Sequence, residues 1–154
     1  MPFSTPATYA SRGNTGYASI FQTGNSASPP VYTPILELKT IGPDLISMSE
    51  VPITTMLSPL NTEEFSPSMI KPGKIAIGGN FIGTADQLNI TTLAQGQTIF
   101  PFQIIAPVQQ SAKTYTLSSK GYVASYKNGP FEINKAIEFA LEIQMTGAYT
   151  ETVA

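Results

Sequence analysis

Strict alternation of apolar and polar residues near the C-terminus constrains the fold more than any other feature. The apolar positions are Ile137, Phe139, Leu141, Ile143 and Met145, and the residues that alternate with them are Ala136, Glu138, Ala140, Glu142 and Gln144. A strand gathers the apolar set on one face, whereas a helix scatters it around its axis. A helix from Glu132 is the alternative, because Ile133, Ile137 and Leu141 recur every four residues. We favour a strand whose core side carries Ile137, Phe139, Leu141 and Ile143.

Several other segments have the composition of strands. We expect strands over residues 35–41, 74–82, 97–108, 114–117 and 121–126, and a short one over 17–21. In the segment 35–41, Leu36 and Leu38 would share a buried face. Pro101 lacks the amide that a sheet ladder needs, so residues 97–108 should form an edge strand or carry a bulge.

A short helix is expected over about residues 85–94. Thr84 and Gln87 fit a capping box, in which each side chain bonds the other residue's amide, and Gly96 is a plausible C-terminal stop. Leu88 and Leu93 would then face a sheet.

Two long irregular segments flank the strand expected over residues 35–41. Residues 1–34 are rich in Ser, Thr, Gly, Asn and Pro, which predicts an extended arm before a domain of residues 35–154. Residues 42–72 contain five prolines and only a brief strand-like piece over 51–56, which predicts a long loop. This loop is too apolar for a solvated linker, so it should be buried against a neighbouring subunit. The residues expected at this contact are Ile46, Met48, Met56, Leu57, Leu60, Phe65, Met69 and Ile70.

Composition argues against most catalytic, metal-binding and membrane classes. The 154 residues suit one domain and include no cysteine and no histidine, so the usual general base and the usual zinc ligands are missing. Charged residues make up 12%, against about 25% in ordinary soluble domains, which suggests that partners cover much of the surface. The net charge of −2, without a basic run, does not indicate a protein that grips nucleic acid. There is neither a long apolar span nor a signal-peptide pattern, and we expect no cofactor.

Two motifs that could suggest catalysis have simpler explanations. The glycines of residues 78–84 precede the expected helix, but the lysine of a phosphate-binding loop is missing. Glu138 and Glu142 would lie about 13 Å apart on a strand, beyond the roughly 5–9.5 Å of glycosidase carboxylate pairs. We therefore do not expect an enzyme.

The succession of elements resembles the major tail tube proteins of siphophages, the long-tailed phages with non-contractile tails. The matching pieces are Ile41-Gly42-Pro43, the stretch from Pro72-Gly73 to Gly79-Asn80-Phe81, Gly121-Tyr122-Val123-Ala124-Ser125, Gly129-Pro130, and the alternating run closed by Thr146-Gly147. The match covers residues 35–147, and its specificity lies in the order of the pieces. Asn134-Lys135 departs from the acidic residues that relatives often have there, which affects local charge.

The resemblance implies a mainly β fold, a β-sandwich or partly closed barrel with one short flanking helix. It also implies hexameric rings that stack around a tape-measure protein, with tail terminator and tail-tip proteins at the ends and DNA passing through the lumen. The long loop and the N-terminal arm would bridge rings. The protein would reside in the virion tail, and in the host cytoplasm during assembly.

The polar side of the last strand is a candidate lining for the lumen. Glu138 and Glu142 are separated by small residues and would repel phosphates mildly, which would let DNA slide. The alternative is that this face points to solvent. Rival functions are the inner tube of a contractile tail or type VI secretion system, and an adhesive or carbohydrate-binding β-sandwich.

Overall fold

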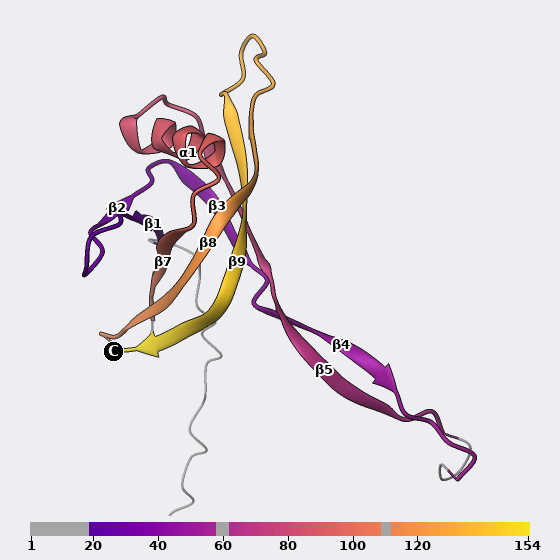
Figure 1. Ribbon diagram of the computed structural model, residues 1–154. Coiled ribbons are helices and arrows are strands. Elements are labelled where there is room, and N and C mark those ends of the chain that lie inside the picture. Colours follow the sequence, from indigo (N-terminus) through magenta and orange to yellow (C-terminus); the bar gives the residue numbers. More distant parts are fainter. Residues whose placement is uncertain (1–18, 58–61, 109–111) are drawn as a thin grey trace, which may run out of the picture.

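The computed structural model describes residues 19–57, 62–108 and 112–154 (Figure 1). The elements follow in the order β1 (Ile20–Gly24), β2 (Tyr32–Pro34), β3 (Leu38–Pro43), β4 (Ile46–Pro52), β5 (Phe65–Pro72), β6 (Lys74–Asn80), α1 (Ala85–Gln95), β7 (Phe100–Pro107), β8 (Thr114–Asn128) and β9 (Glu138–Val153). A mainly β fold with one short helix was predicted, and the structure confirms it.

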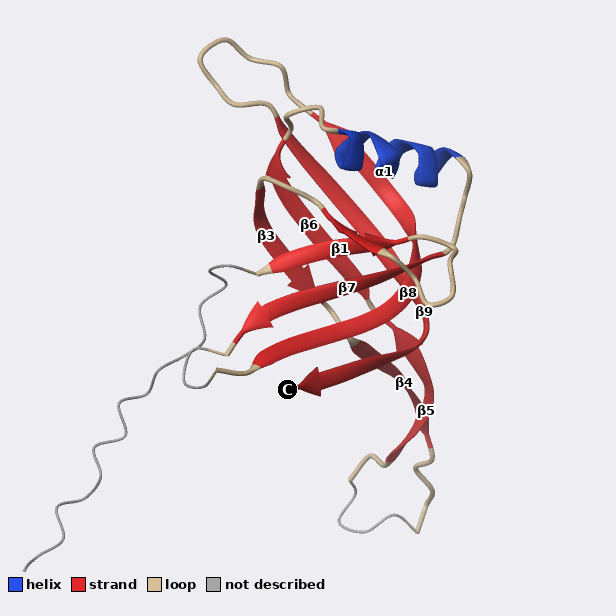
Figure 2. Ribbon diagram, turned by 90° about the vertical axis from the view of Figure 1, so that its left-hand side faces the viewer, coloured by secondary structure: helices blue, strands red, loops and turns tan. Residues whose placement is uncertain are grey.

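Seven strands form one antiparallel sheet in the order β2-β1-β7-β8-β9-β6-β3. Its two longest strands, β8 and β9, pair along most of their length, but their outer neighbours occupy different ends. Strand β7 pairs with β8 only as far as Gly121, and β6 pairs with β9 only between Glu138 and Gln144. The sheet therefore divides into a five-stranded section (β2, β1, β7 and the adjoining parts of β8 and β9) and a four-stranded section (β8 from residue 122, β9 to residue 144, β6 and β3). The sheet is not closed, because β2 and β3 lie at its two edges (Figure 2).

The core lies between these two sections and joins them. Phe21 and Phe102 stack in the five-stranded section with ring centroids 5.7 Å apart. Ile75 and Ile77 face them from β6, and Ile90 covers the core from α1, all three almost fully buried. Burial of these side chains supplies the main stabilisation of a disulfide-free sandwich.

The alternating segment near the C-terminus is strand β9, and residues 132–137 before it are not helical. Phe139, Leu141, Ile143 and Met145 are each at most 3% exposed, whereas Glu138, Ala140 and Glu142 are exposed. Ile137 lies just before the strand and is half-buried. The strand continues through Gly147, whose φ of 75° suits a glycine, to Val153.

The helix lies where it was expected, but the predicted capping box was wrong. The Thr84 side chain makes no capping hydrogen bond, and Gln87 is fully buried beneath the helix. The Gln87 carbonyl oxygen accepts the amides of Ile82 (2.9 Å) and Gly83 (3.2 Å), and its amide group donates to the carbonyl oxygens of Leu36 (3.2 Å) and Asn80 (3.0 Å). These four bonds satisfy a buried polar side chain completely.

The buried face of the helix also differs from the prediction. It carries Gln87, Ile90 and the partly buried Leu93, spaced three residues apart, whereas Leu88 is exposed. Gln87 determines this rotation because its four hydrogen-bonding partners lie on the core side.

Two expectations for the early strands need correction. Strand β3 begins at Leu38, because Glu37 has a φ of 62° that breaks the extended backbone, and Leu36 is consequently exposed. Residues 42–72 are not a loop: β4 and β5 pair as a two-stranded antiparallel hairpin, and the strand-like piece predicted over 51–56 belongs to β4 only as far as Pro52. The segment expected over 17–21 is represented by β1, and residues 17 and 18 lie outside the described part.

Two expectations for the later strands also need correction. The segment expected over residues 97–108 is represented by β7, Phe100–Pro107, which is neither an edge strand nor bulged, because it pairs with both β1 and β8. Pro101 is tolerated there since the pairing with β1 ends at Phe102, the next residue. The two strands expected over 114–117 and 121–126 are one strand, β8, with register shifts between Ser118 and Lys120 and between Val123 and Ser125.

We predict that Phe139 is essential for folding and that its neighbour Glu138 is not. Phe139→Ala should lower the free energy of unfolding by about 3–5 kcal/mol, because a ring packed against Tyr126 (centroids 6.3 Å apart) would leave a cavity. Phe139→Asp should not fold, since it would bury an unpaired charge. Glu138→Gln should leave the free energy of unfolding close to that of the unmodified chain, because an exposed ion pair contributes little. Urea denaturation followed by far-UV circular dichroism measures all three, and equal effects at positions 138 and 139 would contradict the assignment of the two faces.

Candidate assembly surfaces

The β4–β5 hairpin projects away from the sandwich as an arm (Figures 1 and 2). All the described apolar residues that the sequence placed at a subunit contact lie on it, and all are exposed. They are Ile46, Met48, Met56, Leu57, Phe65, Met69 and Ile70, while Leu60 lies outside the described residues. Such a concentration of exposed apolar side chains is unusual for a monomer and marks an interaction surface.

The base of this arm is held firmly to the sandwich. The Gly73 amide donates to the Leu45 carbonyl oxygen (3.2 Å), and the Gln144 side-chain amide of β9 donates to the carbonyl oxygens of Pro72 (3.0 Å) and Gly73 (3.2 Å). A Cβ atom at Gly73 would lie 1.6 Å from the Asp44 carbonyl oxygen, so only glycine fits at the base of the arm, where its two strands converge. The arm thus leaves the body in a defined direction.

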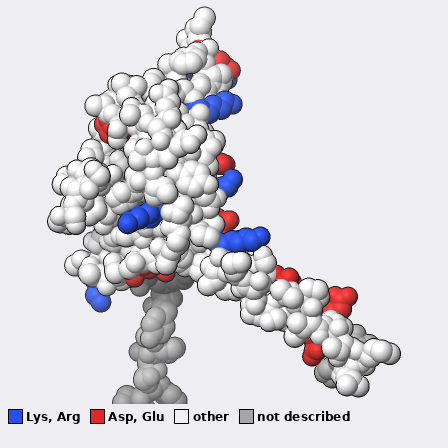
Figure 3. All heavy atoms as spheres, in the orientation of Figure 1, with Lys and Arg blue, Asp and Glu red and all other residues white. Residues whose placement is uncertain are grey.

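The arm carries a segregated charge. Residues 46–70, which end just before Lys71 at the base of the arm, contain three glutamates (Glu50, Glu63 and Glu64) and no lysine or arginine. Their formal charge is −3 and the rest of the chain carries +1, which gives the net charge of −2. The visible face of the projecting arm accordingly shows acidic but no basic groups beyond its base (Figure 3).

The outer face of the four-stranded section is the second candidate surface. The side chains of Glu138, Ala140 and Glu142 point away from the core, and the register places Ala76 opposite Glu142 and Gly78 opposite Ala140. The helix and the five-stranded section lie on the other side of these strands (Figure 1). In this structure the face is therefore exposed and is lined by small residues between charges.

Three lysines that the sequence analysis did not assign share this face. Lys127 pairs in register with Ala140 and Lys74 with Gln144, while Lys39 reaches Glu138 from β3. The alternation of Lys74, Ala76 and Gly78 with buried Ile75 and Ile77 could have placed Lys74 there, but Lys39 and Lys127 depend on strand pairing that the sequence does not show. Glu37, which accepts a hydrogen bond from Asn80, is a third glutamate beside Glu138 and Glu142. The face therefore has three lysines and three glutamates, and its formal charge is balanced rather than acidic.

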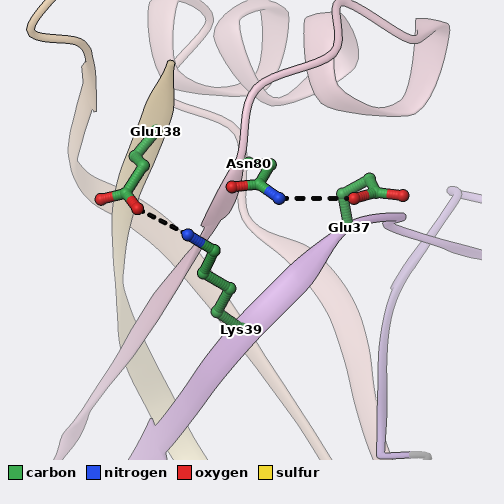
Figure 4. Close-up of polar contacts among 4 residues, drawn as sticks. All are labelled: Glu37, Lys39, Asn80 and Glu138. Carbon is green, nitrogen blue, oxygen red and sulfur yellow. Dashed lines mark hydrogen bonds and ion pairs between the residues drawn. The ribbon is translucent and has the colours of Figure 1, made fainter. Parts of the chain in front are cut away.

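One ion pair ties three strands of this face together (Figure 4). The Lys39 ammonium donates to the Glu138 carboxylate at 2.6 Å, crossing β6, and the neighbouring Asn80 side chain donates to Glu37 at 3.5 Å. The hydrogen bond from Lys39, helped by its positive charge, lowers the pKa of Glu138 below the ordinary value. Both side chains of the pair are about half exposed, so its contribution to stability is small.

The two free edges of the four-stranded section form the third candidate surface. On one side, β3 pairs only with β6; on the other, residues 122–128 of β8 pair only with β9. Within the described ranges these two edges have no further strand partner, so their backbone groups can accept a strand from another chain.

The described residues contain no cluster of three or more His, Cys, Asp or Glu side chains that could hold a metal ion. In the same residues, no helix is long and apolar enough to cross a membrane.

Solved structures share this fold at low sequence identity. The tail of an empty gene transfer agent particle, a structure with C6 symmetry, matches with a TM-score of 0.73 and 13% identity over 91% of this chain and 99% of that chain. The SPP1 tail tube matches with a TM-score of 0.65 and 13% identity over 92% and 78% of the two chains. The sheath-tube complex of an extracellular contractile injection system contains a chain that matches with a TM-score of 0.65 and 12% identity over 99% and 100%. The chain therefore has the fold of phage tail tube proteins.

No protein-family model matches the sequence, and no curated protein is similar enough to be called a relative.

We predict that Lys39 sets the titration of Glu138. The pKa of Glu138 is lowered in the folded chain, so the contact stabilises the fold at pH values above the ordinary pKa of a glutamate and this contribution is lost as the pH falls through the lowered pKa. Lys39→Met should raise the pKa of Glu138 toward its ordinary value, whereas Lys71→Met, at the base of the arm, should leave it unchanged. Carboxyl NMR titration of the unassembled protein measures this, and an unchanged pKa in Lys39→Met would show that the pair does not persist in solution.

Proposed function

We propose that this chain polymerises as stacked hexameric rings into the tail tube of a non-contractile, long-tailed bacteriophage, the conduit through which DNA leaves the particle. It acts as a structural protein and not as an enzyme. The observation that carries the proposal is a four-stranded section with two free edges in a chain that has the tail tube fold. The C6 symmetry of the matching gene transfer agent tail supports six copies per ring.

The free edges suit closure into a ring. The strands of the section alternate in direction across β8, β9, β6 and β3, so the β3 edge of one copy and the β8 edge of the next run antiparallel. An even number of strands lets this alternation continue around the ring, and six copies would close a barrel of 24 strands. Closure would also remove both exposed edges.

Such a barrel would turn the charge-balanced face toward the lumen. The core, the helix and the five-stranded section occupy the other face of each copy, so only the face with Glu138 and Glu142 can point inward. Small residues Ala76, Gly78 and Ala140 would keep the wall smooth. Interleaved lysines and glutamates offer DNA no continuous basic track to grip, and six copies carry a formal charge of −12 per ring.

The arm would bridge neighbouring rings. Its exposed apolar residues would become buried in the polymer, which also explains a chain with only 12% charged residues. The same proposal gives the chain a tape-measure protein inside the tube, terminator and tail-tip proteins at its ends, and a place in the virion tail after assembly in the host cytoplasm. Of the N-terminal arm expected over residues 1–34, residues 1–18 lie outside the described part, and β1 and β2 belong to the five-stranded section.

The inner tube of a contractile tail is the second candidate function. The chain from the contractile injection system covers almost all of this chain, so the fold alone does not separate the two. A tube that binds a sheath protein must present an outer surface for it. Sheathed particles in electron micrographs of the source virion would favour this second function over the first.

The purified protein tests the proposed function directly. At high concentration we expect electron microscopy to show hollow tubes built of six-fold rings. Hydrogen exchange should slow in the assembled form at the amides of β3 and of residues 122–128, because backbone pairing would protect both edges. Strand β2, at the opposite edge of the sheet, serves as an internal comparison that should change less. Absence of tubes, or tubes in which both edges exchange as fast as in the subunit, would refute ring closure through these strands.

A second prediction concerns the lumen. Changing Glu138 and Glu142 together to lysine removes two negative and adds two positive charges per copy on the proposed wall, which should slow DNA ejection and make its rate depend steeply on salt. Asn89→Lys with Gln95→Lys, on exposed positions of α1, provides a control that adds lysines elsewhere. Phage assembled with each variant would be compared by the rate of DNA release. Normal ejection over a range of salt concentrations would exclude these two carboxylates from the DNA path.

A further inference from the structure

The loop between β8 and β9, residues 129–137, carries an apolar surface that the sequence analysis did not identify. Phe131 is 72% exposed and Ile133 is 92% exposed. The loop projects beyond the sheet at the end of the body opposite to the β4–β5 arm (Figures 1 and 2). The molecule therefore has an exposed apolar projection at each end.

The loop is fixed to the sandwich rather than free at its base. The Gly129 amide donates to the Glu138 carbonyl oxygen (2.8 Å), and the Phe81 amide donates to the Ile137 carbonyl oxygen (2.7 Å). The Phe131 ring lies beside Gly129, where its edge would be 3.4 Å from a Cβ atom. Both ends of the loop are therefore fixed relative to the sheet, which reduces the loop entropy that binding would cost.

The charges of the loop are neutral in sum, unlike those of the arm. Glu132 and Lys135 pair with each other at 2.5 Å. Two arms meeting beyond their bases would bring six carboxylates together, because residues 46–70 of each carry −3 and Lys71, the lysine of β5, lies at the base. An arm that meets the loop would instead contact the apolar side chains and a carboxylate, Glu132, whose charge is already neutralised by Lys135. Like-charge repulsion therefore disfavours contact between two arms, and no such repulsion opposes contact between an arm and the loop.

We propose that Phe131 and Ile133 of one copy dock against Met56 and Leu57 near the tip of the arm of a second copy in the adjacent ring. This inference rests on the proposed tube and names the surface that receives the arm. A contact between two different surfaces at opposite ends is heterologous and repeats without closing, which is the geometry that an open stack of rings requires. Methionine is suited to the arm tip because its flexible side chain adapts to a neighbour.

Cross-linking provides the test, since the chain contains no cysteine. Four double variants combine a cysteine at position 131 or 133 with one at position 56 or 57. In assembled tubes treated with a short bismaleimide, we expect at least one double variant to give a ladder of covalent multimers. An intramolecular link is ruled out because the two positions lie at opposite ends of the molecule. Each single-cysteine variant should give no ladder, and Val31→Cys with Leu57→Cys is the control with a similarly exposed site at the side of the body.

Paired substitutions give an independent measurement. Phe131→Ser with Ile133→Ser should leave the circular dichroism spectrum unchanged and abolish the sedimentable tubes, while Val31→Ser should assemble as the unmodified chain does. Tubes that form normally in the serine variant, or tubes in which none of the four cysteine pairs cross-links, would overturn the docking proposal and leave the tube itself standing. Failure of the unmodified chain to form tubes would instead overturn the proposed function, and this inference with it.

Discussion

The apolar row of β9 is the contact on which both halves of the sandwich depend. Phe139, Leu141, Ile143 and Met145 all face the core, while the strand pairs with β8 along its length and with β6 at one end only. The strand therefore belongs to both sections, and its buried side chains fix how one section lies over the other. The residues that alternate with them, Glu138, Ala140 and Glu142, are exposed on the other face of the strand. One strand therefore separates the core from the surface proposed for the lumen.

A single buried amide completes the sandwich where the helix meets the sheet. Gln87 bonds two amides just before the helix and two carbonyl oxygens, one of which, Leu36, lies 51 residues earlier in the chain. Removing its side chain would leave several buried backbone groups without partners, which costs more than one ordinary hydrogen bond contributes. The helix is positioned by this polar contact together with Ile90, and not by a broad apolar stripe.

Elements that bury one face and expose the other could be predicted from the sequence, and elements that expose both faces could not. Strand β9 faces the core on one side only, so its sequence alternates between apolar and polar residues and predicted the strand. Strands β4 and β5 are exposed on both faces, so their sequences do not alternate, and their prolines suggested a loop. The role of Gln87 depends on partners brought by the fold, which a local capping motif cannot reveal. The apolar arm residues were visible from composition alone, but Lys39 and Lys127 reach the face of Glu138 only through strand register. The edges of the sheet likewise require the strand order.

The proposed contacts within a ring and between rings would use different parts of the chain, backbone edges in the first case and side chains in the second. Ring closure would use backbone groups along strand edges, whose fixed spacing and direction determine the angle between copies and hence whether the ring closes. Stacking would use side chains on projections, an arm with methionines and a short loop, which tolerate small differences in angle between successive rings. Separating the two in this way would allow a tube to bend at ring junctions while each ring keeps its bore. The anchoring of the base of the arm through Gly73 and Gln144 fixes the direction in which the arm leaves the body, so successive rings would keep their register.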